Sequence, residues 1–411
     1  MKFSDRMSRI ETSASAMMSQ QAREMKADGI DVIALSSGQP DFPTPEHVIA
    51  AANDAAKRGE TKYTTISGSN ELKDVVLEKF KRENNLDYTR DEIIIGNGSK
   101  QVIYNAFAAG TDEGGEVIIP APFYVAYIDM IKFSGGTPVI IPCGVEQDFK
   151  LKPEQLEAAI TPKTQWLLLN SPNNPSGAVC NNLNDLAKIA KKYKLLILSD
   201  EIYTDLSFDN RYHSISTFYP ELTFISGGLS KWCGAGGWRL GFLAVPKKLN
   251  KFLSSLKSLA SESYSTVNTP TQFAAVEAYE GDYSDYKLKV RGILNAVGNY
   301  VYNNLKSNKI LINPPQGAFY LMPEFKNNKY KSSAKLCEAI LKDTGVAMLP
   351  GSDFGFKPKK MLTRLSYTDF DGKEFFKNVT NYNSISEEMV KRYAPNVVEG
   401  VSKLSNWAKN L

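Results

Sequence analysis

The stretch Leu195-Leu196-Ile197-Leu198-Ser199-Asp200-Glu201-Ile202-Tyr203 decides the fold class of this chain. Its four leading residues are apolar without polar alternation, which is typical of a strand buried on both faces. The preceding residues, 183–193, carry apolar side chains at the spacing of an amphipathic helix. A helix followed by a fully buried strand favours an α/β protein with a mainly parallel sheet and helices on both faces.

Six further short apolar runs extend this pattern to a sheet of seven strands. They lie at residues 93–95, 116–119, 137–141, 166–169, 223–225 and 241–245. After about Tyr286 the pattern changes to a helix (Val290–Leu305) and shorter apolar runs, which predicts a second, smaller α/β domain. Two domains also suit a chain of 411 residues.

We expect three parts along the chain. They are an N-terminal segment (1–44) that packs on the small domain, a large domain (45–285) and the small domain (286–411). Residues 396–411 carry apolar side chains at helical spacing, which predicts a closing amphipathic helix. The polar stretch 370–393 has no pattern that predicts its structure or its role.

The composition is that of an ordinary globular protein. Lys and Arg number 49 against 45 Asp and Glu, and no basic run stands out, so no nucleic-acid partner is expected. The four cysteines lie far apart and only two histidines occur, which argues against a disulfide frame and a metal site. The apolar runs are far shorter than the roughly 18 residues of a membrane span, and the N-terminus lacks the apolar core of a signal peptide. A cytoplasmic protein without membrane contact is therefore predicted.

Polar loops follow four of the predicted strands. They are residues 96–100, 170–177, 199–203 and 226–231. Ligands of parallel α/β sheets bind outside the carboxyl ends of the strands. We therefore expect these loops to form one pocket in the large domain.

The segment Ser230–Gly241 indicates what this pocket binds. Lys231 stands beside a serine, and Arg239 follows across a glycine-rich turn. Lysine forms a Schiff base with an aldehyde when burial or a nearby cation lowers its pKa, and the arginine fork suits a phosphate dianion. A lysine near an arginine is more often a solvated surface pair. Together with the other loops, however, these side chains predict pyridoxal phosphate, which carries both an aldehyde and a phosphate.

Asp200 and Tyr203 would serve the ring of such a cofactor. A carboxylate at the end of a buried strand has a raised pKa unless a cation faces it, and a protonated pyridine nitrogen is such a cation. The phenol of Tyr203 can donate to the 3-oxygen of the ring. The alternative is a helix cap followed by a packed tyrosine. Gly98-Ser99-Lys100 either presents backbone N–H groups to the phosphate at a helix start or is an ordinary turn.

Three further side chains are candidates with open alternatives. Asn174 lies in a turn made rigid by proline and glycine, so its amide either faces the ligand or simply completes the turn. Tyr124 either stacks on the flat ring or packs in the core. Arg364 lies inside an apolar strand, where an unpaired guanidinium is costly. It should therefore face an anion, either a substrate carboxylate or an internal Asp or Glu.

A set of motifs stands in a fixed order along the chain. They are Ser37–Pro45, Lys62–Thr64 with Gly68, Asn173–Gly177, Ser199–Tyr203, Ser230-Lys231, Gly237–Gly241, Gly317–Tyr320, Val346–Gly351 and Arg364–Ser366. With these motifs the chain resembles the class I/II pyridoxal-phosphate-dependent aminotransferases of fold type I, close to the bacterial aspartate aminotransferase type. The set covers roughly residues 10–370, and its order makes it specific.

The resemblance implies three catalytic residues. Lys231 would hold the cofactor as an internal aldimine and then move a proton between the substrate α-carbon and the cofactor C4′. Asp200 would pair with the pyridine nitrogen, and Tyr203 would assist at the 3-oxygen. The resemblance also implies a homodimer with composite active sites.

The remaining roles that the resemblance implies concern binding. The cofactor would be held by Ser99, Lys100, Tyr124, Asn174, Asp200, Tyr203, Ser230, Lys231 and Arg239, with Tyr63 from a second subunit. The substrate α-carboxylate would be held by Gly38, Asn174 and Arg364.

The implied reaction transfers the amino group of an α-amino acid, aspartate by resemblance, to a 2-oxo acid such as 2-oxoglutarate. Aromatic, alanine or methionine donors stay open, because side-chain recognition transfers poorly between related sites. A β- or γ-lyase reaction on the same scaffold also stays open. A regulatory cofactor-binding protein is disfavoured, because the DNA-binding module that it needs has no counterpart in the sequence.

Two departures from the family pattern concern Gly228 and Ala108. Gly228 stands where some relatives carry a phosphate-binding serine. Ala108 stands where some aspartate-specific relatives carry a lysine for the distal carboxylate, which weakens the expectation of aspartate. Ser13 and Ser15 are further candidates for contact with the substrate side chain.

Overall fold

The computed structural model has the seven-stranded sheet that the sequence predicts. It describes residues 4–10, 17, 20, 22, 24–25, 27–29, 31–209, 212–326 and 329–411. The strands are β1 (Ile93–Gly96), β2 (Glu116–Ala121), β3 (Thr137–Pro142), β4 (Thr164–Asn170), β5 (Leu196–Asp200), β6 (Thr223–Gly228) and β7 (Gly241–Ala244). Their order is β1-β7-β6-β5-β4-β2-β3. β7 runs antiparallel to both neighbours, and the other pairs are parallel.

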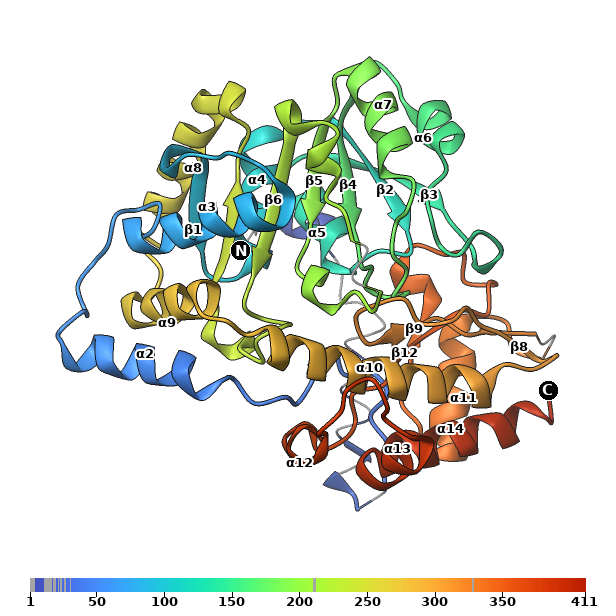
Figure 1. Ribbon diagram of the computed structural model, residues 1–411. Helices are drawn as coiled ribbons and strands as arrows, with labels where there is room; N and C mark the ends of the chain where they lie inside the picture. Colours follow the sequence, from blue (N-terminus) through green and yellow to red (C-terminus); the bar gives the residue numbers. More distant parts are fainter. Residues whose placement is uncertain are drawn as a thin grey trace.

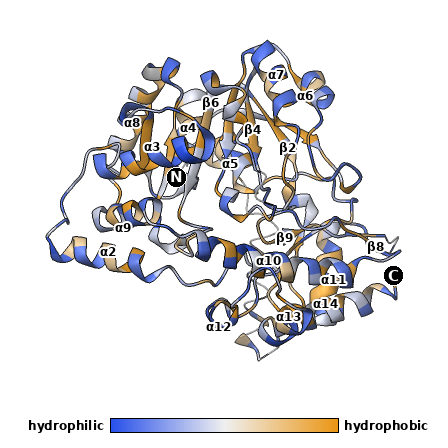
Figure 2. Cartoon of the chain, in the orientation of Figure 1, coloured by the Kyte–Doolittle hydropathy of each residue, from blue (hydrophilic) through white to orange (hydrophobic). Residues whose placement is uncertain are grey.

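Helices cover both faces of this sheet (Figure 1). One face carries α4 (Ser99–Gly110), α5 (Ala126–Phe133) and α8 (Asn250–Ser263). The other face carries α3 (Asn70–Asn84), α6 (Pro153–Ala159), α7 (Leu183–Tyr193) and α9 (Thr269–Glu280). Figure 2 shows apolar strands between helices with hydrophilic outer sides, so the strands need no polar alternation. None of the helices in the described part of the chain combines the length and apolar character that a membrane span requires.

A second group of elements follows α10 (Ser284–Leu305), which runs from the large sheet towards it (Figure 1). A three-stranded antiparallel sheet has the order β11 (Leu349–Pro350), β12 (Thr363–Ser366), β9 (Tyr320–Leu321). The strands β8 (Ile310–Leu311) and β10 (Glu324–Phe325) form a separate pair. The flanking helices are α11 (Ser333–Thr344) and α14 (Pro395–Ala408). The stretch without a sequence pattern forms α12 (Gly372–Asn378) and α13 (Glu387–Tyr393).

The chain before α2 (Glu46–Lys57) contacts both groups of elements. Ile33 forms a parallel bridge with Val346 beside the small sheet. The short 3₁₀ helix η1 (Asp5–Arg9) instead packs on α5, and Arg9 forms an ion pair with Glu113 at 2.9 Å. This course brings Ser36 to Gln39 to the open edge of the large sheet, where they line the cavity described next.

Candidate active site

A cavity of about 680 Å³ opens at the carboxyl ends of the large sheet. One side is formed by the ends of β4 and β5, the start of α4 and the loop after β6. The other side is formed by β9, β12 and the N-terminal segment. All the residues predicted to bind the cofactor or the substrate α-carboxylate, except Tyr63, line this cavity: Gly38, Ser99, Lys100, Tyr124, Asn174, Asp200, Tyr203, Ser230, Lys231, Arg239 and Arg364.

Lys231 lies in the loop that follows β6, with its amine inside the cavity. The Nζ atom donates to the carbonyl oxygen of Gly38 at 2.9 Å and lies 5.8 Å from the ring centroid of Tyr203. Burial lowers the pKa of Lys231 to about 8, and the nearby guanidinium of Arg364 adds to this while Asp200 opposes it. A lysine of such a pKa is partly neutral near pH 8, so its amine can attack a carbonyl carbon.

Asp200 ends β5 and is 4% exposed. Its carboxylate accepts hydrogen bonds from Tyr127 Oη at 2.5 Å, Ser226 Oγ at 2.9 Å and Ser99 Oγ at 3.3 Å. Burial raises the pKa of Asp200 above its ordinary value, although the hydrogen bonds from Tyr127 and Ser226 oppose the shift. The donors favour the anion, and a cation on a ligand in the cavity would stabilise it further.

Arg364 lies on β12, and its guanidinium is buried beside the ring of Tyr320. Nη2 donates to the carbonyl oxygen of Ser36 at 2.6 Å, and Nη1 donates to Asn174 Oδ1 at 3.4 Å. Nε has no hydrogen-bond partner within the described residues, and no acidic side chain there acts on the pKa, which burial lowers. The guanidinium can therefore receive a carboxylate from a ligand.

The opposite end of the cavity is positive. Gly98 precedes α4 with a φ of 85°, and a Cβ atom there would lie 2.5 Å from Nη2 of Arg239. That guanidinium donates to the carbonyl oxygens of Gly236 at 2.9 Å and Asn97 at 3.1 Å. Lys100 follows in the first turn of the helix. Arginine, lysine and a helix N-terminus together fit a phosphate group.

A line of polar groups joins the two sides of the cavity. Asn174 Nδ2 donates to Tyr203 Oη at 3.4 Å, and this hydroxyl lies 3.1 Å from Tyr320 Oη. Tyr320 Oη in turn donates to Gly38 O at 3.4 Å. Burial raises the pKa of Tyr203 well above its ordinary value, so its hydroxyl stays protonated and can donate to an oxygen of a bound molecule.

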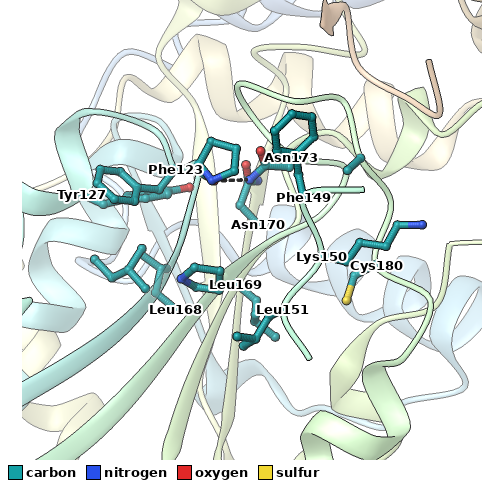
Figure 3. Close-up of a pocket in the computed structure, with 14 residues that line it drawn as sticks. Phe123, Tyr127, Phe149, Lys150, Leu151, Leu168, Leu169, Asn170, Asn173 and Cys180 are labelled. Carbon is teal, nitrogen blue, oxygen red and sulfur yellow. Dashed lines mark hydrogen bonds between the residues drawn. The ribbon is translucent and has the colours of Figure 1, made fainter. Parts of the chain in front are cut away.

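A second, smaller cavity of about 40 Å³ shares Asn170 and Tyr127 with the large one (Figure 3). Tyr127 lines both cavities, and Lys150 and Cys180 lie on the far side of the small one. Asn173 Nδ2 donates to Pro122 O at 3.2 Å, and both residues line the small cavity. The remaining lining is mainly apolar and the space is too small for a cofactor, so we assign the chemistry to the large cavity.

Comparison with known proteins identifies the family. The family model "Aminotransferase class I and II" matches residues 30–374. The chain belongs to this family. An aspartate aminotransferase from Bacillus sp. (strain YM-2) is 40% identical to this aminotransferase over 364 residues, which cover 86% of the chain and 92% of the relative.

Two further comparisons agree with this family assignment. An aspartate/prephenate aminotransferase from Cereibacter sphaeroides is 39% identical to this aminotransferase over 386 residues, covering 90% of this chain and 95% of the relative. The crystal structure of the aspartate aminotransferase from Rhizobium meliloti matches with a TM-score of 0.87 and 33% identity. That match covers 100% of this chain and 99% of the other. The predicted family, fold class and transaminase activity are confirmed.

Tyr63 was predicted to serve the site of a second subunit of this aminotransferase. Its side chain is 88% exposed and lies outside the cavity of its own chain. A single chain does not test whether Tyr63 serves a second subunit, so that role stays a prediction. Ser13 and Ser15 lie outside the described residues.

Ala108 does not lie where a residue could contact the substrate side chain in this chain's cavity, so the prediction made from it was wrong. This residue is exposed on α4 and is not among the described residues that line the cavity. An alignment of the helix by sequence alone chose a position on its outer face. The alanine therefore says nothing about recognition of the substrate side chain.

Sequence reasoning also missed Tyr127, Ser226 and Ser36. Ser226 is the register partner of Asp200 on the neighbouring parallel strand, so aligning the two strand ends could have found it. Tyr127 gives no sequence signal beyond an aromatic residue in an apolar helix. Ser36 acts through its backbone carbonyl, which every residue carries.

Proposed function

We propose that this aminotransferase moves the amino group of aspartate to a 2-oxo acid such as 2-oxoglutarate, with pyridoxal phosphate held at Lys231. One observation carries the proposal: a lysine of lowered pKa, a hydrogen-bonded carboxylate and an arginine without an acidic partner face one cavity. These three groups suit an aldehyde, a ring nitrogen and a substrate carboxylate. The names of the relatives support aspartate as the donor.

The cofactor, when bound, supplies an electron sink for the substrate α-carbon. Asp200 would hold the ring nitrogen in its protonated form, and Tyr203 would donate to the 3-oxygen, with Asn174 beside Tyr203. Lys231 Nζ would be the base that takes the proton from the substrate α-carbon and then returns it to the bound molecule. Tyr124, which lines the cavity, would cover one face of the ring. The phosphate would be held by Ser99, Lys100, Ser230 and Arg239, and the substrate α-carboxylate by Gly38, Asn174 and Arg364.

Aspartate also has a second carboxylate, and Lys100 is a candidate to receive it. The side chain is exposed and its ammonium lies 5.4 Å from the ring centroid of Tyr124, whereas Arg239 is engaged with two carbonyl oxygens. Lys100→Met separates this role from phosphate binding. A side-chain role predicts a KM for aspartate about tenfold higher with the KM for alanine unchanged. A phosphate role predicts weaker cofactor binding for every donor.

An absorption spectrum of the purified protein tests the reaction itself. L-aspartate should move the visible band of the lysine-bound cofactor to the near ultraviolet, and 2-oxoglutarate should restore it. The control variant Lys231→Ala should show neither change. A band that responds only to another amino acid would reject aspartate and keep transamination. No band after addition of pyridoxal phosphate would reject the whole proposal.

We also propose a homodimer in which Tyr63 of one subunit reaches the phosphate end of the other site. The exposure of this tyrosine, and of Ile66 (38%) in the same segment, supports a covering partner. Sedimentation should give a mass of two chains, and Tyr63→Ala should weaken cofactor binding.

The domain division and the location remain proposals as well. A division near residue 286 is supported by α10, which begins at Ser284 and leads from the large sheet to the small one. All four cysteines are free, which suits a reducing compartment such as the cytoplasm.

A further inference from the structure

Six charged side chains form a group, here called the rear cluster, behind the loops that carry the active site. The rear cluster consists of Lys79, Glu83, Glu201, Asp205, Lys287 and Arg291. None of the six is among the described residues that line the large cavity, and the proposed reaction uses none. Three of them line a separate cavity of about 20 Å³ together with Trp232.

Lys287, in the first turn of α10, contacts two of these loops with one ammonium group. Its Nζ atom forms an ion pair with Asp205 Oδ1 at 2.8 Å, with 18% and 15% of the two side chains exposed. The same atom lies 4.4 Å from the ring centroid of Trp232, which is 2% exposed. Tyr279 and Tyr283 also pack against this indole, with ring centroids at 6.3 and 6.2 Å, and Lys287 is the cation that faces it.

Each contacted segment has one side towards the cavity and one towards the rear cluster. Trp232 directly follows Lys231, and Asp205 lies two residues after Tyr203. Lys231, Tyr203 and Asp200 line the large cavity, whereas Trp232 and Asp205 line the small one behind it. The rear cluster therefore contacts the segments of Trp232 and Asp205 on the side that faces away from the large cavity. The opposite side of the same segments carries Lys231 and Tyr203.

We propose that Lys287 is a positioning residue that acts through Trp232 and Asp205 to fix Lys231 relative to Asp200. The inference rests on the proposed function of Lys231. An ion pair and a cation–π contact that are largely shielded from water are stronger than the same contacts on the surface. The helix that carries Lys287 also continues towards the small sheet that supplies Arg364, so it connects both halves of the site (Figure 1).

The alternative is that the rear cluster only stabilises the fold. Burial acts to raise the pKa of Asp205, but the ammonium groups of Lys287 and Lys79 outweigh it and hold the pKa below its ordinary value. Removing Lys287 alone would take away the ion-pair partner of this buried carboxylate, which is costly whatever the role of the pair. A double substitution that removes both charges avoids this problem.

The test compares Lys287→Met/Asp205→Asn with the wild-type protein and with Lys360→Met/Glu324→Gln. In the control pair, Lys360 Nζ lies 2.9 Å from Glu324 Oε1, and both side chains are partly buried. This pair lies beside the small sheet and contacts neither the Trp232 segment nor the Asp205 segment. Each protein is freed of cofactor and mixed with pyridoxal phosphate. The rate at which the visible band appears is measured against pH, and thermal unfolding is recorded in parallel.

We expect the Lys287 double variant to form the band about tenfold more slowly, with a shifted pH midpoint, and the control pair to match the wild type. Lys287→Arg should stay within about threefold of the wild type, because a guanidinium also pairs with carboxylates and stacks on aromatic rings. A double variant that loses stability but keeps the wild-type rate and midpoint would overturn the inference alone. No band in the wild-type protein would overturn the proposed function and this inference with it.

Discussion

Asp200 and Arg364 are buried charges on opposite sides of one cavity, and their surroundings differ. Three hydroxyl groups from the large sheet and its helices donate to Asp200. Arg364 has a carbonyl and an amide oxygen as its acceptors, and its Nε has none within the described residues. The chain thus supplies hydrogen-bond donors for the Asp200 carboxylate. It supplies no carboxylate for the Arg364 guanidinium within the described residues, so a ligand can provide one.

This difference matches the two ligands of the proposed reaction. The cofactor stays bound at Asp200, whereas the substrate binds and leaves at Arg364 in every turnover. Donors built into the sheet edge can hold Asp200 ready for a cofactor that stays bound through many turnovers. A substrate carboxylate instead needs a guanidinium that has no internal competitor. Burial raises the pKa of Asp200 and lowers that of Arg364, so an opposite charge from a ligand would stabilise either group.

The largest expected effect follows from Arg364→Met. If Arg364 holds the substrate carboxylate as proposed, the variant lacks that contact, and kcat/KM for amino-acid donors should fall about a thousandfold. Cofactor affinity should stay within about twofold, because Asp200 and its donors are untouched. Steady-state kinetics and titration of the apo-protein with pyridoxal phosphate measure the two quantities separately.

Arg364→Lys is the matched control for this prediction. It keeps the charge but not the planar fork, so an intermediate loss of about a hundredfold is expected. If Arg364→Met weakened cofactor binding as strongly as substrate use, the two sides of the cavity would not have separate roles.

The contrast also explains what the sequence could predict. Lys231, Asp200 and Arg364 are charged residues placed at strand ends or within apolar strands. A charged side chain at such a position is costly to bury, so it indicates a functional site. Tyr127 is a neutral residue in an apolar helix, and nothing in the sequence distinguishes it from a core side chain. The carbonyl of Ser36 meets Arg364 only because the N-terminal segment crosses the sheet edge, and no local pattern encodes that path.

A second prediction concerns the stability of the apo-protein and the pKa of Lys231. Its folded value of about 8 lies below the ordinary 10.5, so between these pH values the unfolded chain binds a proton that the folded chain lacks. Wild-type stability should therefore rise with pH through this window, and below pH 8 the folded state bears the cost of a buried ammonium. Lys231→Met should be more stable by about 3 kcal/mol at pH 7, since each pKa unit corresponds to about 1.4 kcal/mol.

Urea unfolding of the apo-protein at pH 7, 9 and 10.5 measures this advantage, which should shrink as the pH rises. Lys192→Met is the control, because that side chain is 61% exposed and paired with Glu157 on the surface. It should show no gain at neutral pH. A gain for Lys231→Met that stayed constant with pH would point to apolar packing instead of the lowered pKa.

The smallest effect is expected from Tyr127→Phe, which removes one of the three donors to Asp200. A hydrogen bond to a charged group contributes roughly 1.5–3 kcal/mol, so cofactor affinity should fall by between about tenfold and about a hundredfold. The loss should grow as the pH falls, because a carboxylate with fewer donors takes up its proton more readily. Tyr124→Phe removes a hydroxyl from the same cavity without touching Asp200, and should change the affinity less than about twofold. Equal cofactor affinities for Tyr127→Phe and the wild type would mean that the hydrogen bond from Tyr127 does not prepare Asp200 for the cofactor. The difference between the two sides of the cavity would then depend only on the open guanidinium of Arg364.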